Sequence, residues 1–258
     1  MKKSRWMVVL FLLSSMTISM IGCGSSTTVD TMKKIKKKGE IVWGTNAAFP
    51  PFEMRKGDEV IGADAEIAAK IADKLGVKLK VEDMDFEGLI NALNAKKVDF
   101  VAAGLTVRPD REEQVLFTDK YFKAVQKIIV REGDTEIKGA KDLKGKAIGV
   151  QKGTTGAIVA EEDYTKNVVR FDNGPEAAID LKNGRLDAVL IDNLPAQMIA
   201  GQNPGLAVLD EKAADDEEYA MAVRKSDKDL QKVINEVLSE LQSSSRIDEW
   251  VEEYSFLQ

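Results

Sequence analysis

The stretch VDFVAAGLTVRPDREEQVLFTD, residues 98–119, decides the fold. It begins as a short apolar run, ends in small residues at Ala103 and Gly104, and restarts as a helix behind Pro109. A buried strand followed by a helix is typical of a parallel sheet. Arg111 stands just beyond the strand, and its planar guanidinium suits a carboxylate. We therefore expect a space beside Arg111 that an anionic group can occupy.

The residues around this stretch repeat the alternation of short apolar runs and helical periodicity. In this first unit we expect strands at residues 41–45, 79–83 and 100–103 and helices at residues 64–75 and 86–95. Residues 126–132 form a strand that leaves the unit. Strands that alternate with helices predict a parallel sheet.

A second unit follows the same pattern, without any short-period repeat. We expect a strand with a Gly/Thr loop within residues 143–155, strands at 168–171, 185–192 and 219–225, and helices at 156–163, 175–182, 195–200, 229–244 and around Trp250. Two cores of about 100 residues each lie within the usual size of domains. The sequence therefore predicts an α/β protein built from two units of unequal size.

The composition argues for binding rather than catalysis. The chain has 258 residues, a formal net charge of −6, no histidine and one cysteine. Without histidine, the side chain most used for proton transfer near neutral pH is missing, and no Cys/His metal cluster or Ser/His/Asp arrangement can form. We expect no metal and no cofactor. An acidic chain without basic stripes also argues against nucleic acid as a partner.

The first residues have the pattern of a secretory signal: a basic start, an apolar run and small residues before Cys23. A membrane anchor is the alternative, but the run is short and interrupted by serines. Residues 20–23, Met-Ile-Gly-Cys, resemble a bacterial lipobox, with methionine where leucine is usual, which implies lipid on Cys23. We expect a signal peptide at 1–22 and a lipidated tether at 23–38, whose lysines form a solvated helix face.

Ligands of open α/β sheets lie beyond the carboxyl ends of the strands. That rule selects residues 46–49, Phe86, 103–111, 151–156 and Asp192. An arginine and backbone N–H groups can hold a carboxylate, and the aspartate can hold an ammonium. Both groups on one small molecule make an α-amino acid. If they stood alone, Arg111 could instead be a helix-start residue paired with Asp110 or Glu112, and Asp192 a helix cap.

Five segments in this order carry a family resemblance: GTNAAFPPFE, residues 84–119, GVQKGTTG, GRLDAVLID and YAMAVRK. Together they resemble the extracytoplasmic solute-binding proteins of polar amino-acid ABC importers, in particular glutamine and basic amino-acid binders. The resemblance covers nearly the whole mature chain. It implies a two-lobed periplasmic-binding-protein fold of type II, in which each lobe is a mainly parallel sheet flanked by helices and two crossover strands join the lobes.

The resemblance also implies the roles of the site residues. The ligand α-carboxylate would contact Arg111, Thr106 and the backbone at Gly104 and Thr155, and the α-ammonium would contact Asp192 and the carbonyl of Gly104. The rings of Phe49 and Phe86 would enclose the ligand side chain. The full set of expected ligand-binding residues is Asn46, Phe49, Phe86, Ala103, Gly104, Thr106, Arg111, Gln151, Thr154, Thr155 and Asp192.

The identity of the ligand depends on departures from the family pattern. Asn46 stands where many relatives have aspartate, Gln151 where glutamine binders have lysine, and Gly156 where basic amino-acid binders often have glutamine; Ala103 replaces a frequent serine. A buried cationic side chain needs an anionic partner, and amides do not supply one. We therefore favour glutamine. Glu53 is the one acid close by in sequence, so a basic amino acid remains an alternative ligand. Cystine is another alternative.

The resemblance implies a large lobe at 39–120 and 220–258, a small lobe at 126–214, and hinges near 121–125 and 215–219. The expected protein is a monomeric extracytoplasmic receptor, anchored to the cell membrane by lipid on Cys23. It would deliver a free L-amino acid to an ABC permease. A dehydratase-like enzyme on the same scaffold is one alternative, although Asp192 as an ammonium partner argues against it. A receptor-kinase sensor domain is the other, but no membrane span follows before Gln258.

Overall fold

The computed structural model describes residues 31–257. Eight strands form one continuous sheet in the order β5-β1-β6-β11-β7-β10-β8-β9. At one end of the sheet β1 (Glu40–Thr45) pairs in parallel with β5 (Lys78–Asp83) and β6 (Phe100–Val101). At the other end β8 (Ile148–Gln151) pairs in parallel with β9 (Val168–Phe171) and β10 (Ala188–Asp192). These two groups of strands are the sheets of the two lobes.

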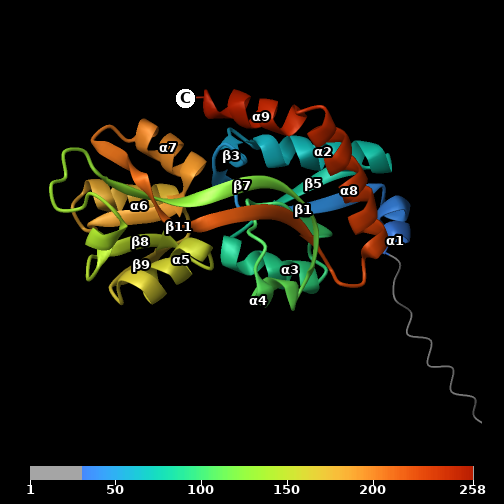
Figure 1. Ribbon diagram of the computed structural model, residues 1–258. Helices are drawn as coiled ribbons and strands as arrows, with labels where there is room; N and C mark the ends of the chain where they lie inside the picture. The colour runs from blue at the N-terminus through green and yellow to red at the C-terminus, as the bar shows by residue number, and fades with distance from the viewer. Residues whose placement is uncertain (1–30, 258) are drawn as a thin grey trace, which may run out of the picture.

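Two long antiparallel strands join the lobes (Figure 1). They are β7 (Leu116–Arg131) and β11 (Leu206–Val223), which pair with each other along most of their length. The pairing has register shifts between Val208 and Lys212 and again between Lys212 and Asp216. Because β7 also pairs with β10 and β11 pairs with β6, both long strands belong to both lobes.

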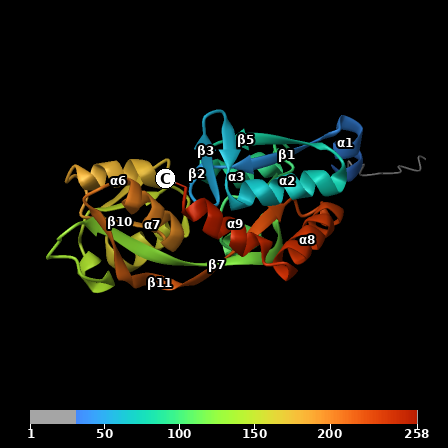
Figure 2. The same cartoon turned by 90° about the horizontal axis from the view of Figure 1, so that it is seen from above.

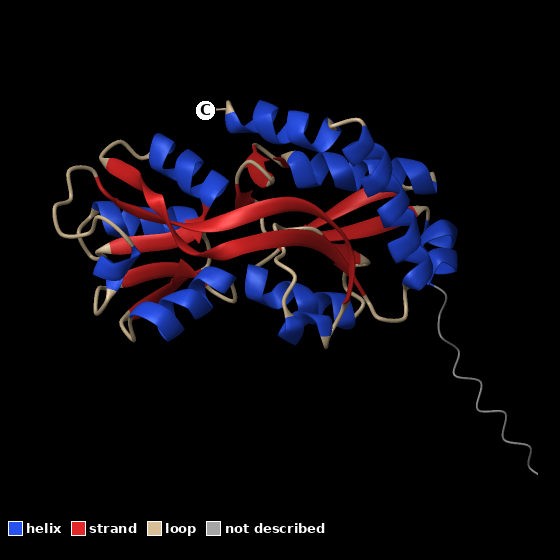
Figure 3. Ribbon diagram, viewed as in Figure 1, coloured by secondary structure: helices blue, strands red, loops and turns tan. Residues whose placement is uncertain are grey.

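Helices cover both faces of the sheet (Figure 3). In the large lobe one face carries α2 (Ala63–Leu75), α8 (Lys228–Ser243) and α9 (Arg246–Ser255), and the other carries α3 (Leu89–Asn94) and α4 (Pro109–Glu112), as Figure 1 shows. The helices of the small lobe are α5 (Thr155–Val159), α6 (Gly174–Lys182) and α7 (Asn193–Gln202). Seen from above, the two lobes lie side by side along β7 and β11 (Figure 2).

The burial pattern explains why the strands form where they do. All five residues of β10 are buried, and so are five of the six residues of β1. Strands covered by helices on both faces are continuous apolar runs rather than alternating ones. The α2 helix is amphipathic instead, with one buried stripe that includes Ile67 and Ile71. It ends at Gly76, which has the left-handed conformation.

The expected elements are present, with differences in detail. The predicted helix at 86–95 opens as a 3-10 turn, η1 (Phe86–Gly88), before α3, and residues 160–164 continue α5 as a π-helical turn, η3 (Ala160–Tyr164). The acidic residues before Tyr219 lie inside β11. Outside the large sheet, β2 (Ala48–Phe49), β3 (Glu53–Lys56) and β4 (Glu59–Ile61) form a small antiparallel sheet that the sequence did not predict; a short 3-10 turn, η2 (Ala140–Leu143), precedes β8.

The basic stretch forms α1 (Thr31–Lys38), in which Ile35 is buried while its lysines lie on the exposed side, as expected for a solvated helix face. Thr31 donates a hydrogen bond to Asp227 at 2.9 Å. The predicted signal peptide and Cys23 lie outside the described residues. Within residues 31–257 no helix is both long and apolar enough to cross a bilayer.

Candidate functional site

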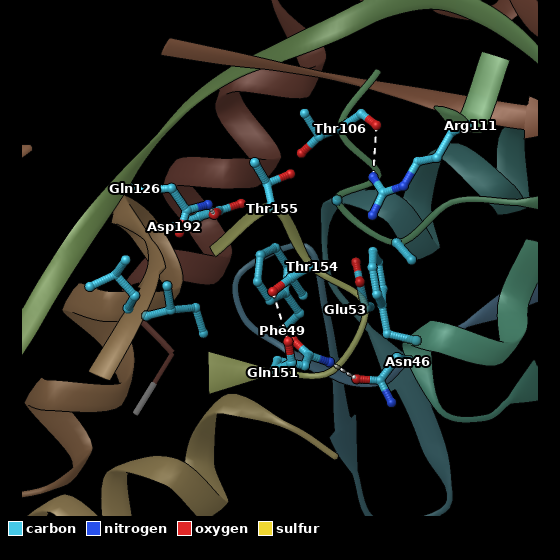
Figure 4. Close-up of a pocket in the computed structure, with 15 residues that line it drawn as sticks. Asn46, Phe49, Glu53, Thr106, Arg111, Gln126, Gln151, Thr154, Thr155 and Asp192 are labelled. Atoms are coloured by element: carbon cyan, nitrogen blue, oxygen red, sulfur yellow. Dashed lines mark hydrogen bonds between the residues drawn. The ribbon is translucent and has the colours of Figure 1, made fainter. Parts of the chain in front are cut away.

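One pocket lies between the two lobes, at the carboxyl ends of β1, β6, β8 and β10 (Figure 4). Its lining residues surround about 430 Å³ of space not filled by protein atoms, part of which is open to solvent. All eleven residues expected from the sequence line it, together with four that were not expected: Glu53, Gln126, Leu190 and Ile191. The structure thus brings the predicted set together in one place, while their contact with a ligand stays a prediction.

Arg111 lies in α4 and is only 3% exposed. Its Nη1 donates to the carbonyl oxygen of Thr106 at 2.7 Å, and its Nη2 donates to the carbonyl oxygen of Gly153 in the other lobe at 3.0 Å. The guanidinium carbon lies 5.3 Å from the centre of the Phe86 ring. Burial lowers the pKa of Arg111 to about 10, so the side chain still carries its charge at neutral pH. The side chain is not paired with Asp110, which bonds Arg108 instead.

Asp192 ends β10 and precedes α7, but its side chain makes no capping bond to that helix. Its carboxylate accepts hydrogen bonds from Gln126 Nε2 and from the hydroxyl of Tyr219. Burial, and then the charge of Glu217, raises the pKa of Asp192 to about 7. A cationic group beside Asp192 would offset both effects by favouring the ionised form.

Gln126 and Glu217 join the two sides of the pocket. Gln126 Nε2 donates to Glu217 Oε1 at 3.0 Å, and the hydroxyl of Thr106 donates to Glu217 Oε2 at 2.6 Å. Both lie on the long strands, Gln126 on β7 and Glu217 on β11, where they are buried. The hydrogen-bond network therefore runs from the large lobe through the connecting strands to Asp192.

Gly104 does not present its N–H as expected. The sequence suggested a free backbone donor for a carboxylate, but Gly104 N donates to Asp64 Oδ2 at 3.2 Å. Its role is steric, because at φ +53° a Cβ at this position would lie 2.5 Å from Phe49 Cε1. Thr155 was also expected to contact the carboxylate, and its buried hydroxyl has no hydrogen-bond partner.

Two predicted residues already bond each other across the pocket. Gln151 Nε2 donates to Asn46 Oδ1 at 2.9 Å, and also to the carbonyl oxygen of Asp172 at 3.2 Å. Asn46 Nδ2 donates to the carbonyl oxygen of Met84 at 2.9 Å (Figure 4 labels Asn46 and Gln151). The Thr154 hydroxyl also has hydrogen-bond partners. It donates to Gln151 O at 2.8 Å and caps α5 by accepting from Ala157 N.

Glu53 lines the pocket, although the sequence predicts no binding role for it. It lies on β3, lines the pocket and is completely buried (Figure 4). No N–H group or hydroxyl donates to either oxygen of its carboxyl group, and the carboxyl group of Asp64 lies within hydrogen-bonding reach. Burial, followed by the charge of Asp64, raises its pKa well above the usual value. Its position four residues after Phe49 in GTNAAFPPFE was the available signal.

Comparisons with known proteins agree with this geometry. Residues 41–258 match the family model described as bacterial extracellular solute-binding proteins, family 3. The arginine-binding extracellular protein ArtP of Bacillus subtilis is 34% identical over 249 residues, covering 95% of each chain. The arginine-bound truncated ArgBP of T. maritima is 42% identical with a TM-score of 0.78, over 81% of this chain and 99% of that one. An ancestral arginine-binding protein bound to glutamine is 40% identical with a TM-score of 0.77, over 84% and 97%.

Proposed function

The chain belongs to the bacterial extracellular solute-binding proteins of family 3, and from this premise we propose that it is the receptor of an amino-acid ABC importer with arginine as its preferred ligand. Its homologues are solute-binding proteins rather than enzymes. The observation that carries the proposal is that Arg111 and Asp192, which have opposite charges, line one pocket between two lobes.

The α-carboxylate of the ligand would bind the guanidinium of Arg111. The hydrogen bond from this guanidinium to Gly153 O spans the cleft. The unpartnered hydroxyl of Thr155 would be a second donor to the same group. The α-ammonium would lie against Asp192. Charge-assisted hydrogen bonds of this kind are about twice as strong as neutral ones. The ligand side chain would then run past Phe49 and Phe86 toward Glu53 and Asn46.

Glu53 supports arginine over a neutral ligand. A buried carboxyl group without a partner can bond a guanidinium through two parallel hydrogen bonds. The sequence favours glutamine, because the amides of Asn46 and Gln151 carry no charge. Glutamine is the second candidate, since the amides of Asn46 and Gln151 line the same pocket and a related ancestral protein is bound to glutamine.

Titration calorimetry with arginine, lysine, glutamine and cystine tests the ligand. We expect arginine to bind most tightly, and Glu53→Gln to lose affinity for arginine much more than for glutamine. Glu59→Gln is the matched control, because Glu59 is exposed on β4 and outside the pocket. Tighter binding of glutamine than of arginine by the wild-type protein would contradict the choice of arginine and leave the receptor proposal standing.

The lobes and hinges belong to the same proposal. A large lobe at 39–120 and 220–258 and a small lobe at 126–214 would close on the ligand by rotation near 121–125 and 215–219. In support, the regular pairing of β11 with β7 is interrupted at both borders of the second hinge region, between Lys212 and Asp216 and between Tyr219 and Ala220. We propose a monomer that delivers the amino acid to a permease.

We also propose that Cys23 is lipidated after removal of residues 1–22. The support is the position of the one cysteine behind an apolar segment. Labelled fatty acid should enter the wild-type protein and not Cys23→Ser, and the variant should leave the membrane fraction. Equal labelling of both proteins would contradict the anchor.

A further inference from the structure

Two buried carboxyl groups lie next to each other behind the candidate pocket. Glu53 is on β3 and Asp64 is in the first turn of α2, and both are completely buried. The backbone fixes their proximity, because Asp64 N donates to the carbonyl oxygen of Phe52, the residue before Glu53, at 2.9 Å. The proposed function uses Glu53 alone and gives Asp64 no part.

The two groups are satisfied very unequally. Asp64 accepts hydrogen bonds from the Tyr121 hydroxyl at 2.7 Å and from Gly104 N at 3.2 Å. Glu53 accepts no hydrogen bond from an N–H group or hydroxyl, so a proton shared with Asp64 is the one hydrogen bond open to it, and it lines the pocket. A hydrogen-bonded carboxylate is favoured over an unbonded one, so of the two Asp64 is the better place for the negative charge and Glu53 the better place for a proton.

No cation in the described part of the chain neutralises Glu53 directly. The charged or titratable groups around it are Asp64 from α2, Tyr121 from β7, Tyr219 from β11, Asp83 from β5, Arg55 from β3, and Arg111 and Asp192 across the pocket. Arg55 is bound to Asp83 at 2.7 Å and is exposed. Arg111 is bound to two carbonyl oxygens. When two adjacent carboxyl groups have no cation beside them, the charge of one disfavours ionisation of the other and raises its pKa.

We propose that Glu53 and Asp64 together hold one proton in the ligand-free pocket and that a cationic ligand side chain expels it, whereas a neutral side chain leaves it in place. The inference rests on the proposed function. In the step, the O–H bond of the Glu53 carboxyl group breaks, the proton leaves to solvent, and the carboxylate pairs with the ligand cation. The guanidinium of arginine keeps its own protons throughout, because it does not titrate in this range. Asp64 acts as a positioning residue that disfavours the charge on Glu53 until a cation arrives.

Proton release makes the affinity for cationic ligands depend on pH. If one proton leaves per ligand bound, the affinity rises about tenfold per pH unit while Glu53 is protonated in the free protein. Arginine and citrulline form a matched pair of ligands, since they have the same shape and the same α-groups but differ in side-chain charge. Any proton lost from Asp192 when the α-ammonium binds is common to both ligands and cancels in the comparison.

The experiment is titration calorimetry of the wild-type protein with arginine and with citrulline, at one pH near 7, above the pKa of about 6 of Asp64, and in two buffers that differ in ionisation enthalpy. We expect arginine to release about one proton more than citrulline. In Glu53→Gln, which keeps the shape of the protonated side chain, the two ligands should release the same number. Equal release by both ligands from the wild-type protein, or the same excess in Glu53→Gln, would overturn the proposal.

Infrared difference spectroscopy supplies a readout that needs no neutral ligand. Addition of arginine to the wild-type protein should remove more of the C=O stretch of protonated carboxyl groups than it does in Glu53→Gln, where Asp192 still contributes, while Glu59→Gln should keep the full change. A wild-type spectrum in which arginine removes no such band overturns the proposal even if arginine binds tightly. Failure of every amino acid to bind would instead contradict the proposed function.

Discussion

Gln151 and Asn46 hydrogen bond each other across the cleft, with 2.9 Å between Gln151 Nε2 and Asn46 Oδ1. One residue ends β8 in the small lobe and the other follows β1 in the large lobe. Together with the bond from Arg111 to Gly153 O, this contact joins the lobes at both ends of the candidate pocket. The closed arrangement is therefore held by polar groups that also line the ligand space.

The close approach of the lobes at Gly153 gives a first prediction. At φ +73° a Cβ on Gly153 would lie 3.0 Å from Glu87 Cβ and 3.1 Å from Glu87 Cα, in the opposite lobe. Gly153→Ala should weaken ligand binding by hindering closure. Gly145→Ala is the matched control, because Gly145 has φ +76° and nothing within 4 Å. Both variants should lose about 1 kcal/mol of stability from the left-handed backbone, while only Gly153→Ala loses affinity in calorimetry. Equal affinities of the two variants would contradict closure at this contact.

The second prediction concerns the guanidinium of Arg111. Arg111→Ala should nearly abolish binding, because removing one partner of a buried ion pair costs about 3 to 5 kcal/mol. At about 1.4 kcal/mol per tenfold change, the affinity should fall roughly a hundred-fold to several thousand-fold. Arg108→Ala is the control, since Arg108 pairs with Asp110 and does not line the pocket. Calorimetry that finds Arg111→Ala within about threefold of the wild type, or a ligand-free variant that no longer folds, would show a structural role.

The third prediction follows from the raised pKa of Asp192. Because this pKa is about 7 and the α-ammonium favours the ionised carboxylate, every amino acid should bind more weakly as the pH falls below about 7. Asp192→Asn should bind more weakly than the wild type at neutral pH, with a smaller loss than Arg111→Ala, because the amide oxygen still accepts from the ammonium. The variant should also lose this pH dependence. Calorimetry from pH 5 to pH 8 with glutamine, which avoids the charge response of Glu53, makes the comparison; an unchanged slope in Asp192→Asn would assign the titration to another group.

The fourth prediction concerns stability. Burial raises the pKa of Asp64 from 3.8 to about 6, so the folded protein binds this proton more tightly than the unfolded chain. The raised pKa of Asp64 therefore contributes on the order of 3 kcal/mol to the free energy of unfolding. This contribution is complete below about pH 4 and is lost as the pH rises to about 6. Urea unfolding of the ligand-free protein should show this fall, and Asp64→Asn should reduce it. A wild-type protein that gains stability over the same range, or an unchanged fall in the variant, would contradict the assignment.

The sequence predicted the fold and the place of the site because both follow from strand periodicity. The ends of β1, β6, β8 and β10 could be located from apolar runs, and the carboxyl ends of parallel strands meet at one edge of a sheet. This rule places Arg111, Gln151 and Asp192 at one site from the sequence alone. The ordered motifs of a known family added the two-lobed architecture.

Other features depended on contacts that the sequence does not encode locally. The strands β2, β3 and β4 have two to four residues each, which is too short to show a period. Gln126 lies 66 residues from the Asp192 carboxylate that it bonds, so no local pattern connects them. The N–H of Gly104 was expected to be free, but it is used by Asp64, 40 residues earlier. Glu53 is visible in the sequence, but only the structure shows that it is buried and lines the candidate pocket.

The central claim is that a free amino acid binds between Arg111 and Asp192. The most direct measurement is the thermal unfolding of the protein in the presence of each common amino acid, repeated with Arg111→Ala. A ligand at about 100 times its dissociation constant should add about 2.7 kcal/mol to the free energy of unfolding. We predict that arginine gives the largest stabilisation of the wild-type protein and that Arg111→Ala removes it. No stabilisation by any amino acid, or the same stabilisation in Arg111→Ala, would contradict the account.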